Sequence, residues 1–376
     1  MQEKKNILFA SSWYPNTDNP FLGNFVKRQA QLLAKVHHVT VINTVPDNKI
    51  KELSVTVEIS DKLTEISAHH PQGRSIFDKR KFQKKALELA IQQIDFKPDL
   101  LLTQIILPKG WQFETLKKKF KIPWVHLEQG SYFRQSERRK WNFIQKMIVK
   151  KCERSIDKFI ASSDFVRKDL LDLFPGRKID LLPNHVNTTL FCPEKSKNRD
   201  YTQFLHISTL DPRTKDPIGI IDACKLTKER SNKPFKLSIV SDGKTKELID
   251  YIERQGLKEV VEVTGSKQWE ELPSFYQNSD AFILNSIYET FSIVLAEAWA
   301  CGIPTITTPV GVGYNLSKEL GINTTINDPE SIANAMISFM NNKEQFDSEK
   351  IRAFGLQFSE ECVLNELNRI LSNVYE

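Results

Sequence analysis

The stretch AFILNSIYETFSIVLAEAWACGIPTIT, residues 281–307, decides the fold because it contains one complete strand–loop–helix–strand unit. Residues 281–284 form a short apolar run typical of a buried strand, and residues 305–307 would be the next strand. Between them, residues 291–301 have the apolar density of a helix that packs on a sheet, and Gly302 would end it. Such a unit places the loop and the amino end of the helix at the carboxyl edge of a parallel sheet, where open α/β sheets bind their ligands.

Two carboxylates stand eight positions apart across this turn, Glu289 in the loop and Glu297 in the helix. The backbone N–H groups of Phe291 and Ser292, at the expected helix start, could hold a phosphate, and each carboxylate could accept hydrogen bonds from a diol. A molecule with a diol on each side of a diphosphate is a nucleotide sugar. The alternative, that both glutamates are solvated residues of a helix end, stays open for Glu289. Glu297 interrupts a nearly all-apolar helix, where a carboxylate needs partners.

This stretch resembles the retaining glycosyltransferases of family 4. Their signature is two glutamates separated by seven residues, with an aromatic residue two positions after the first and a Gly-x-Pro ending, and residues 289–304 match it. The resemblance implies an α/β protein of the GT-B fold, with two Rossmann-like domains whose parallel sheets face each other across a cleft. It also implies that Glu289 orients the donor sugar and that Glu297 binds the ribose. The other donor-binding residues of this turn would be Thr290, Phe291 and Ser292.

Further segments extend the resemblance over most of the chain. Residues 6–30 are similar to the family's first strand, loop and first helix, with Gly23 where the loop approaches the donor diphosphate. Residues 204–223 are similar to the first strand and helix of the second domain, with Lys215 where the family neutralises the diphosphate. Nucleotide-contacting loops are expected at Gly243 and Gly265.

Several departures from the family pattern qualify these roles. Thr209 stands where the family usually has an Arg, so one charge-assisted contact to the donor, worth about 1.5–3 kcal/mol, is missing or supplied elsewhere. Ser241 and Ser292 replace glycines. Gln129 ends a strand whose family version ends in His beside the donor sugar; an amide cannot act as a base but can bond a sugar hydroxyl, so altered sugar selection is expected rather than lost chemistry. His126 should point to the other side of that strand, as a packed or exposed histidine.

The length and the order of these motifs predict two domains, since 376 residues are long for a single core. Residues 1–190 are expected to form an N-terminal, acceptor-binding domain, 191–199 a linker, and 200–357 the nucleotide-sugar-binding domain. By the resemblance, a helix in residues 358–376 crosses back onto the first domain. Neither half has the Gly-x-Gly-x-x-Gly that a dinucleotide dehydrogenase carries after a strand.

Composition predicts a soluble globular protein in the cytoplasm. Apolar residues make up 40% of the chain and charged residues 27%, yet no apolar run approaches the roughly 20 residues that span a bilayer. The amino terminus shows no signal-peptide pattern. The five cysteines are scattered, which favours reduced thiols and argues against a metal site. We expect no cofactor, because a nucleoside diphosphate sugar would be a substrate.

Charge is unevenly distributed. Residues 1–190 hold 33 Lys and Arg against 20 Asp and Glu, whereas the remainder holds 20 against 27. One basic cluster, residues 138–151, also has Phe143, Ile144, Met147 and Ile148 at helical spacing, which indicates a basic amphipathic helix. This helix could lie peripherally on the anionic inner face of the membrane, or it could bury its apolar face in its own domain. Nothing resembles a nucleic-acid recognition motif, so nucleic acid is not an expected partner.

By the resemblance, the protein is expected to move a hexose-type sugar from a nucleoside diphosphate donor to a glycan or lipid-linked acceptor, with retained anomeric configuration and without a metal. Catalysis would rest on Glu289, Lys215 and Gln129, and Thr209 would border the diphosphate. A role in bacterial surface polysaccharide assembly is expected by analogy. Two alternatives stay open: a non-catalytic nucleotide-sugar-binding subunit of the same fold, and a sugar-nucleotide epimerase.

Overall fold

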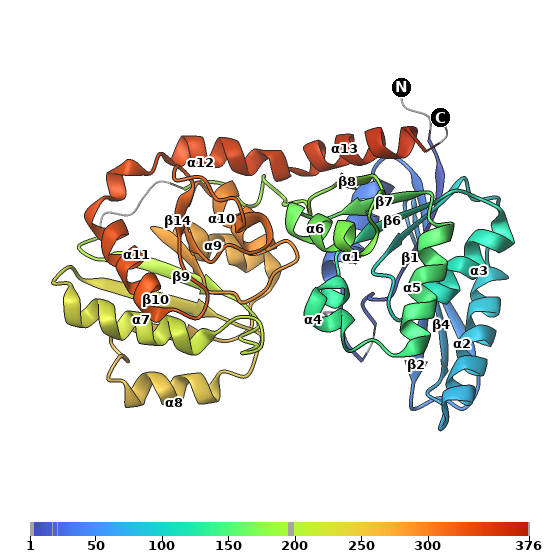
Figure 1. Cartoon of the computed structure of the whole chain (residues 1–376), viewed down its shortest axis with the longest axis horizontal. Coiled ribbons are helices and arrows are strands. Elements are labelled where there is room, and N and C mark those ends of the chain that lie inside the picture. The colour runs from blue at the N-terminus through green and yellow to red at the C-terminus, as the bar shows by residue number, and fades with distance from the viewer. Residues whose placement is uncertain (1–3, 17, 21, 195–198, 375–376) are drawn as a thin grey trace. The chain divides into compact units, whose positions relative to one another are not determined.

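The computed structural model describes residues 4–16, 18–20, 22–194 and 199–374. The chain divides into two compact units, each built on one sheet (Figure 1). Unit 1 comprises Met1–Ser162, Val166–Leu182 and Leu364–Glu376, and unit 2 comprises Ser163–Phe165 and Pro183–Val363. Residues 195–198 of the expected linker and the last two residues of the expected C-terminal helix lie outside the described residues.

The sheet of unit 1 has the strand order β3-β4-β2-β1-β5-β6-β7-β8. Its pairs are parallel except for β3, which runs antiparallel to β4 at one edge. The strands are β1 Asn6–Ser11, β2 His38–Asp47, β3 Ser54–Ser60, β4 Leu63–Pro71, β5 Leu100–Gln104, β6 Trp124–Glu128, β7 Lys158–Ala161 and β8 Ile179–Leu181.

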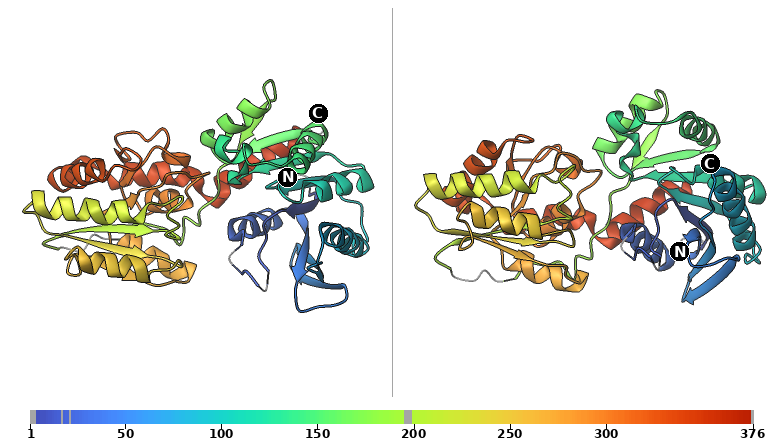
Figure 2. Two further views of the ribbon diagram at one scale, coloured as in Figure 1. Left: turned by 60° about the horizontal axis from the view of Figure 1, so that its bottom comes forward. Right: turned by 90° about the horizontal axis from the view of Figure 1, so that it is seen from below.

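Helices cover both faces of this sheet (Figures 1 and 2). The central strands are therefore apolar on both sides, and Leu8, Phe9, Leu101 and Leu102 are fully buried. The helices in this part of the chain are α1 Asn24–Ala34, α2 Ile76–Ile91, α3 Gly110–Phe120, α4 Gln135–Arg138, α5 Phe143–Ser155, α6 Asp164–Leu173 and, after unit 2, α13 Glu360–Ser372.

Unit 2 has an all-parallel sheet of order β11-β10-β9-β12-β13-β14. In chain order these strands read 3-2-1-4-5-6, the arrangement of the Rossmann fold. The strands are β9 Thr202–Ile207, β10 Phe235–Val240, β11 Val261–Thr264, β12 Ala281–Leu284, β13 Thr305–Thr307 and β14 Gly321–Asn323. The helices are α7 Pro217–Arg230, α8 Lys246–Arg254, α9 Leu272–Gln277, α10 Ile293–Ala300, α11 Pro329–Asn341 and α12 Ser348–Gly355.

The boundary between the units differs from the expected one. Residues 183–190 were expected in the first domain and Phe191 in the linker, but all of them belong to unit 2. Val186 and Phe191 are buried in a core cluster of that unit, and Arg352 on α12 donates hydrogen bonds to the carbonyl oxygens of Phe191, at 2.6 Å, and Thr188, at 2.8 Å. Apolar burial and these bonds therefore attach the segment to unit 2.

The C-terminal helix returns to unit 1. Asn368 on α13 meets His37, whose Nε2 lies 2.9 Å from the Asn368 Oδ1, and the His37 Nδ1 accepts a hydrogen bond from the Lys5 backbone. Burial lowers the pKa of His37, so its neutral imidazole is favoured here. Among the described residues, none of the helices has the length and apolar character needed to cross a bilayer.

Candidate functional site

Unit 2 has a topological switch point between β9 and β12, the neighbouring strands that lead to opposite sides of the sheet. In open parallel sheets, ligands bind beyond the carboxyl ends of the strands at such a point. Lys215 lies in the loop from β9 to α7, and Glu289 lies in the loop from β12 to α10. The topology therefore brings together two predicted site residues that are 74 positions apart in the sequence.

Lys215 and Glu289 form a direct ion pair. Their side chains are 16% and 12% exposed, so the pair is largely screened from water but reachable from it. The Ser286 hydroxyl also donates to the Glu289 Oε1, at 2.8 Å. This pair presents one ammonium and one carboxylate side by side. The ammonium is suited to bind a phosphate, and the carboxylate is suited to accept a hydrogen bond from a hydroxyl.

Further hydrogen bonds join the two loops. The Ile287 N–H donates to the Thr214 carbonyl at 2.8 Å, and the Asn285 amide donates to the Asp216 carboxylate, also at 2.8 Å. Asp216 in turn caps the amino end of α7. Sequence reasoning gave no role to Asn285 or Asp216, although a polar residue directly after a buried strand was the available signal.

The helix after Glu289 begins later than expected. Residues 291–301 were predicted to be helical, but α10 spans Ile293–Ala300 and Ser292 is its N-cap. Ser292 has a φ of 77°, a left-handed conformation that glycine adopts more easily, which is why replacing the family's glycine matters here. Its buried hydroxyl has no hydrogen-bond partner among the described residues. The first free N–H groups of the helix therefore include those of Ile293 and Val294 as well as those predicted.

Glu297 is buried, with 3% of its surface exposed. A buried carboxylate in an apolar helix needs hydrogen-bond partners. Its Oε2 accepts a hydrogen bond from the Tyr276 hydroxyl at 2.9 Å, and its Oε1 accepts one from the Trp269 indole at 3.3 Å. Burial and the neighbouring carboxylate raise the pKa of Tyr276 well above its usual value. The protein therefore supplies at least part of the hydrogen bonding that was predicted to come from a ligand.

Three further predicted positions of unit 2, Gly243, Thr209 and Gly265, differ in how tightly they pack. A Cβ at Gly243 would overlap the carbonyl oxygen of Thr209, so the two loops touch through their main chains. The Gly243 N–H donates to the Ser241 hydroxyl at 2.9 Å. Thr209 is exposed, and Gly265 has open space where a side chain would project. Only Gly243 among them is required by local geometry.

A buried network of three glutamines occupies the corresponding edge of unit 1. The Gln129 amide donates to the Gln29 Oε1 and to the Gln104 Oε1, at 3.0 Å each, and the Gln104 amide donates to Gln29. The network therefore fixes the side chain of Gln129. It leaves one acceptor, the Gln129 Oε1, and one donor, the Gln29 Nε2, without a partner among the described residues.

Gly23 supports this network indirectly. It is the N-cap of α1, the helix that carries Gln29, and has a φ of 68°. A Cβ at this position would lie 2.9 Å from the Trp13 carbonyl carbon and oxygen. Gly23 is therefore required by its backbone geometry, and it starts the helix that positions the glutamines.

His126 is fully buried and takes no part in the glutamine network. Its Nδ1 lies 2.8 Å from the Thr103 hydroxyl, and its Nε2 lies 3.2 Å from the Glu128 carboxylate. Glu128 also accepts hydrogen bonds from the N–H groups of Gln129, at 2.9 Å, and Gly130, at 2.6 Å. His126 is thus a packed histidine that helps Glu128 hold the main chain on either side of Gln129.

Unit 1 also contains a partly buried lysine that the sequence did not reveal. The Lys109 ammonium donates to the Asn43 Oδ1 at 2.9 Å and to the Thr44 carbonyl at 3.1 Å. Burial lowers the pKa of Lys109 to about 8. Both of these acceptors are neutral oxygens, in contrast to the carboxylate that pairs with Lys215.

The predicted amphipathic helix forms as α5, and the residues it buries are not the ones the spacing suggested. Phe143, Ile144 and Met147 are 79%, 52% and 53% exposed, whereas Val149 and Cys152 are buried. Ile148 is half-buried against the core. Three of the four expected apolar residues therefore remain on the surface beside the basic side chains.

Two family models match consecutive stretches of the chain. The model described as Glycosyltransferase Family 4 matches residues 22–190, and the model described as Glycosyl transferases group 1 matches residues 190–353. An uncharacterized glycosyltransferase of Methanocaldococcus jannaschii is 26% identical over 280 residues, which cover 71% of this chain and 73% of that protein. The O-antigen chain mannosyltransferase B of Escherichia coli is 26% identical over 187 residues, covering 46% and 49%.

Solved structures agree on the architecture. The sucrose-phosphate synthase from Thermosynechococcus elongatus superposes with a TM-score of 0.75 at 18% identity and covers 99% of both chains. Anabaena HepE, solved in complex with UDP and glucose, has a TM-score of 0.71 at 17% identity, covering 98% of this chain and all of that one. At such identities the likeness establishes the fold, which is the predicted GT-B type.

Proposed function

Because the chain belongs to the glycosyltransferases of family 4, we propose that it transfers a hexose-type sugar from a nucleoside diphosphate donor to a glycan or lipid-linked acceptor, with retention. The observation that carries this proposal is the Lys215–Glu289 pair at the switch point between β9 and β12. It joins a cation for the diphosphate to an acceptor of hydroxyl hydrogen bonds at the edge where ligands of such sheets bind.

Departure of the nucleoside diphosphate builds negative charge on the phosphate oxygens. Lys215 would stabilise that charge, together with the N–H groups at the start of α10, because both are fixed before the reaction begins. The Lys215 ammonium would exchange part of its bonding from Glu289 to the phosphate, which would free Glu289 for a donor hydroxyl.

The other predicted residues have subsidiary roles in this proposal. Glu297, which accepts hydrogen bonds from Tyr276 and Trp269, would also bind the ribose. The unused Gln129 Oε1 would accept a hydrogen bond from a sugar hydroxyl. Gly23 would allow its loop to approach the diphosphate.

Retention requires the new bond to form on the face that the leaving group vacates. The acceptor oxygen would bond to the anomeric carbon as the carbon–oxygen bond to the diphosphate breaks, and the acceptor proton would pass to the leaving phosphate oxygen. This scheme needs no protein base, which agrees with an amide at position 129. Lys215 would do the neutralising work that a divalent ion does in other transferases, so we propose turnover without an added metal.

Relatives support the substrate class. One is named as an O-antigen chain mannosyltransferase, and another as a galactosyltransferase that acts on a diphosphoundecaprenol-linked sugar. HepE has also been solved in complex with UDP-glucose. We therefore propose a nucleoside diphosphate hexose as donor and a role in surface polysaccharide assembly.

The exposed side chains of α5 support peripheral binding to an anionic membrane surface. Phe143, Ile144 and Met147 could enter the interface while neighbouring lysines meet the headgroups, each worth about 1 kcal/mol. Flotation with anionic liposomes should carry the protein upward at low salt and lose it at high salt. Equal flotation with neutral vesicles would contradict this electrostatic part of the proposal.

The transferase proposal is tested by incubating the full chain, treated with a chelator, with a panel of nucleotide sugars and measuring release of the nucleoside diphosphate. We expect slow release with one donor and loss of release in Lys215→Ala and Glu289→Ala. Tight nucleotide-sugar binding without release under any acceptor would instead favour the non-catalytic subunit, for which Thr209 and Gln129 are the motivation. A changed sugar without net nucleotide release would favour an epimerase.

A further inference from the structure

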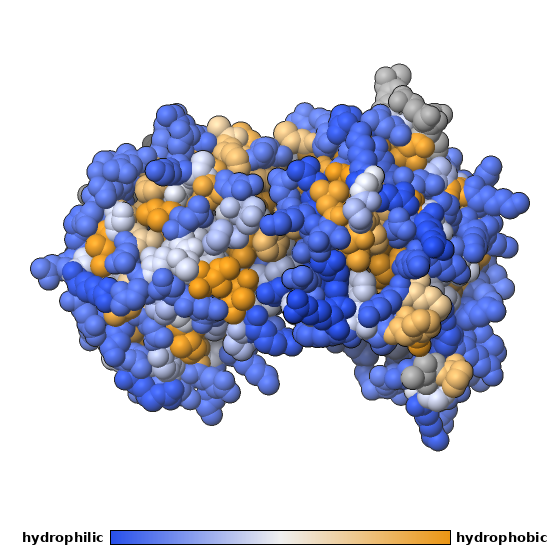
Figure 3. Space-filling model, viewed as in Figure 1, coloured by the Kyte–Doolittle hydropathy of each residue, from blue (hydrophilic) through white to orange (hydrophobic). Residues whose placement is uncertain are grey.

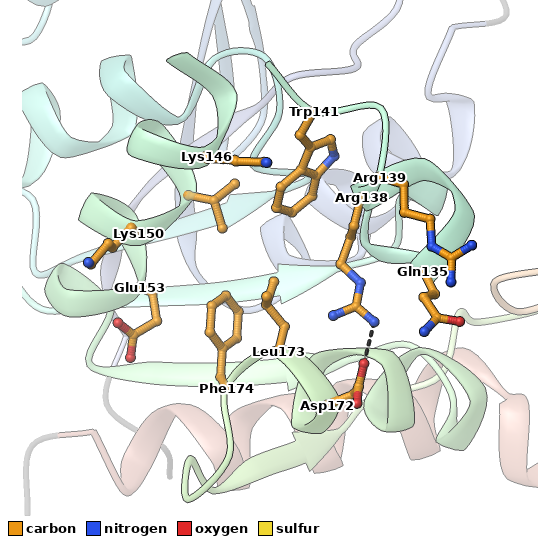
Figure 4. Close-up of a pocket in the computed structure, with 11 residues that line it drawn as sticks. Gln135, Arg138, Arg139, Trp141, Lys146, Lys150, Glu153, Asp172, Leu173 and Phe174 are labelled. Carbon is orange, nitrogen blue, oxygen red and sulfur yellow. Dashed lines mark hydrogen bonds and ion pairs between the residues drawn. The ribbon is translucent and has the colours of Figure 1, made fainter. Parts of the chain in front are cut away.

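A pocket of about 620 Å³ lies within unit 1, between α4, α5 and the end of α6 (Figure 4). Its volume falls in the range of roughly 300–1,000 Å³ that small-molecule sites occupy. It is separate from the glutamine network and from the Lys215–Glu289 pair. The residues that line it are Gln135, Arg138, Arg139, Trp141, Lys146, Val149, Lys150, Glu153, Asp172, Leu173 and Phe174.

The inner part of the pocket is apolar. Trp141, Val149 and Phe174 are 9%, 2% and 8% exposed and pack in the main core cluster of the unit, with Leu173 against them. In Figure 4, Trp141 lies opposite Leu173 and Phe174, and the space is between them. A short length of hydrocarbon chain could therefore be buried there, at about 0.8 kcal/mol for each CH₂ removed from water.

The rim of the pocket is cationic. Arg138, Arg139, Lys146 and Lys150 line it, and its two acidic residues already have partners. Asp172 is paired with Arg138, and the Glu153 carboxylate accepts a hydrogen bond from the Arg177 Nε at 2.9 Å. The free charge that faces a ligand is therefore positive.

Two buried donors at the pocket lack acceptors. The Arg138 Nε and the Trp141 Nε1 have no hydrogen-bond partner among the described residues. Both groups can only donate, and an unsatisfied buried donor is costly. An oxygen-rich anion that enters beside Arg138 would provide the missing acceptors.

The same surface has an apolar margin. Phe143, Ile144 and Met147 begin α5, directly after the pocket residue Trp141, and stand exposed. Figure 3 shows apolar atoms among hydrophilic ones on the face that carries α4 and α5. A ligand that reaches this pocket from a membrane would pass beside side chains suited to the interface.

We propose that this pocket binds the phosphate or diphosphate group, with the first carbons of the chain, of a membrane-embedded lipid that carries the acceptor sugar. This inference deepens the proposed function, on which it rests, by naming the class of acceptor and the place where its anionic end is held. Arg138, Arg139 and Lys146 bind the phosphate oxygens, while Trp141, Leu173 and Phe174 cover the first carbons.

The test compares three probes by calorimetry on the full chain: farnesyl phosphate, farnesol and inorganic phosphate. Farnesyl phosphate should bind at least about tenfold more tightly than either other probe, because only it satisfies both the cationic rim and the apolar interior. Equal affinity for inorganic phosphate, or no binding of farnesyl phosphate, would overturn the proposal.

Three variants locate the site. Lys146→Glu reverses a rim charge and Leu173→Trp fills the interior from a half-buried position. Each should weaken farnesyl phosphate binding by about tenfold or more. Arg154→Glu makes the same change of charge on α5 outside the pocket lining and should have little effect. Equal weakening by Arg154→Glu would mean that general surface charge, not the pocket, binds the probe.

Donor turnover separates this inference from the proposed function. Without an acceptor, release of nucleoside diphosphate is not expected to use the residues that line this pocket. It should therefore be unchanged in Lys146→Glu and Leu173→Trp, which also shows that both variants are folded. Intact release with no farnesyl phosphate binding in the unmutated protein would defeat the pocket proposal alone. Absent release with intact binding would defeat the transferase proposal alone.

Discussion

The two units, each built on a sheet of mainly parallel strands, carry different functional groups at the carboxyl edges of those sheets. In unit 2 the edge presents a lysine paired with a carboxylate, Lys215 with Glu289. In unit 1 the edge presents amides, with Gln129 hydrogen-bonded to Gln29 and Gln104. It also presents a lysine, Lys109, that donates hydrogen bonds to neutral oxygens. The fold determines where on the sheet a ligand can bind. A few side chains at that edge determine whether charged groups or neutral hydrogen-bonding groups are available to bind it.

The largest expected effect is at the charged edge. Lys215→Ala should lower release of the nucleoside diphosphate by about 100-fold or more, because a fixed group that stabilises developing charge is removed. Lys246→Ala, an exposed lysine on α8 of the same unit, is the matched control and should leave release unchanged. Equal losses in both variants would mean that Lys215 acts only through the general charge of unit 2.

The stability of the protein should depend on pH through His206, a buried histidine of unit 2, and not through the exposed histidines. Burial lowers the pKa of His206 from 6.5 to about 4, so the unfolded chain binds a proton in this window and the folded chain does not. The resulting stability is fully present above pH 6.5 and is lost as the pH falls toward 4, by about 3 kcal/mol in total.

Urea unfolding of the full chain between pH 7.5 and 4.5 checks this prediction. His206→Gln should reduce the loss of stability on acidification, whereas His38→Gln, at an exposed histidine, should not. The same pH dependence in His206→Gln and in the unmutated protein would contradict the assignment.

The neutral edge should respond differently from the charged one. Gln129→Leu leaves the buried Gln104 Oε1 without its donor and should reduce the free energy of unfolding by about 1–3 kcal/mol. Binding of a nucleoside diphosphate without sugar should be unchanged, while the preference among nucleotide sugars should shift. Calorimetry with the free nucleotide and turnover with the donor panel measure the two effects, and lost nucleotide affinity would argue that Gln129 supports the fold only.

The smallest expected effect is at the start of α10. Ser292→Gly should stabilise the protein by up to about 1 kcal/mol, because glycine adopts the left-handed backbone without strain. It also removes a buried hydroxyl that has no hydrogen-bond partner among the described residues. The same substitution at Ser338, an exposed position inside α11, should destabilise by about 0.5–1 kcal/mol. Thermal unfolding midpoints measure both, and a drop in both variants would show that the backbone at Ser292 is not strained.

The fold and the charged edge of unit 2 could be predicted from the sequence, because both depend on local sequence patterns. An apolar run, a turn and an apolar helix suffice to predict the unit at residues 281–307, and parallel topology then brings Lys215 to Glu289. The glutamine network was beyond such reasoning, since its members are 75 and 25 positions from Gln104 and no local pattern connects them. The start of α10 was wrong by two residues because apolar density does not report the backbone angle of Ser292.

Other features depend on packing that a single sequence does not specify. Residues 183–190 were assigned to the first domain but belong to unit 2. Their position is decided by the burial of Phe191 and by Arg352, which is 161 positions from Phe191 in the sequence. For α5 the spacing of apolar residues left two outcomes open, and only the burial of Val149 and Cys152 showed which face the core takes. Glu297 was expected to need partners, and the structure supplied Tyr276 and Trp269.

The contact between Gly243 and Thr209 has a consequence for how this site can change over evolutionary time. The main chain of residue 209 is what Gly243 touches, while the Thr209 side chain is exposed. Mutations at position 209 can therefore exchange a threonine for a longer, charged side chain without disturbing the scaffold, whereas any side chain at position 243 would force the loops apart. Substitution is therefore expected to be tolerated at position 209 and not at position 243.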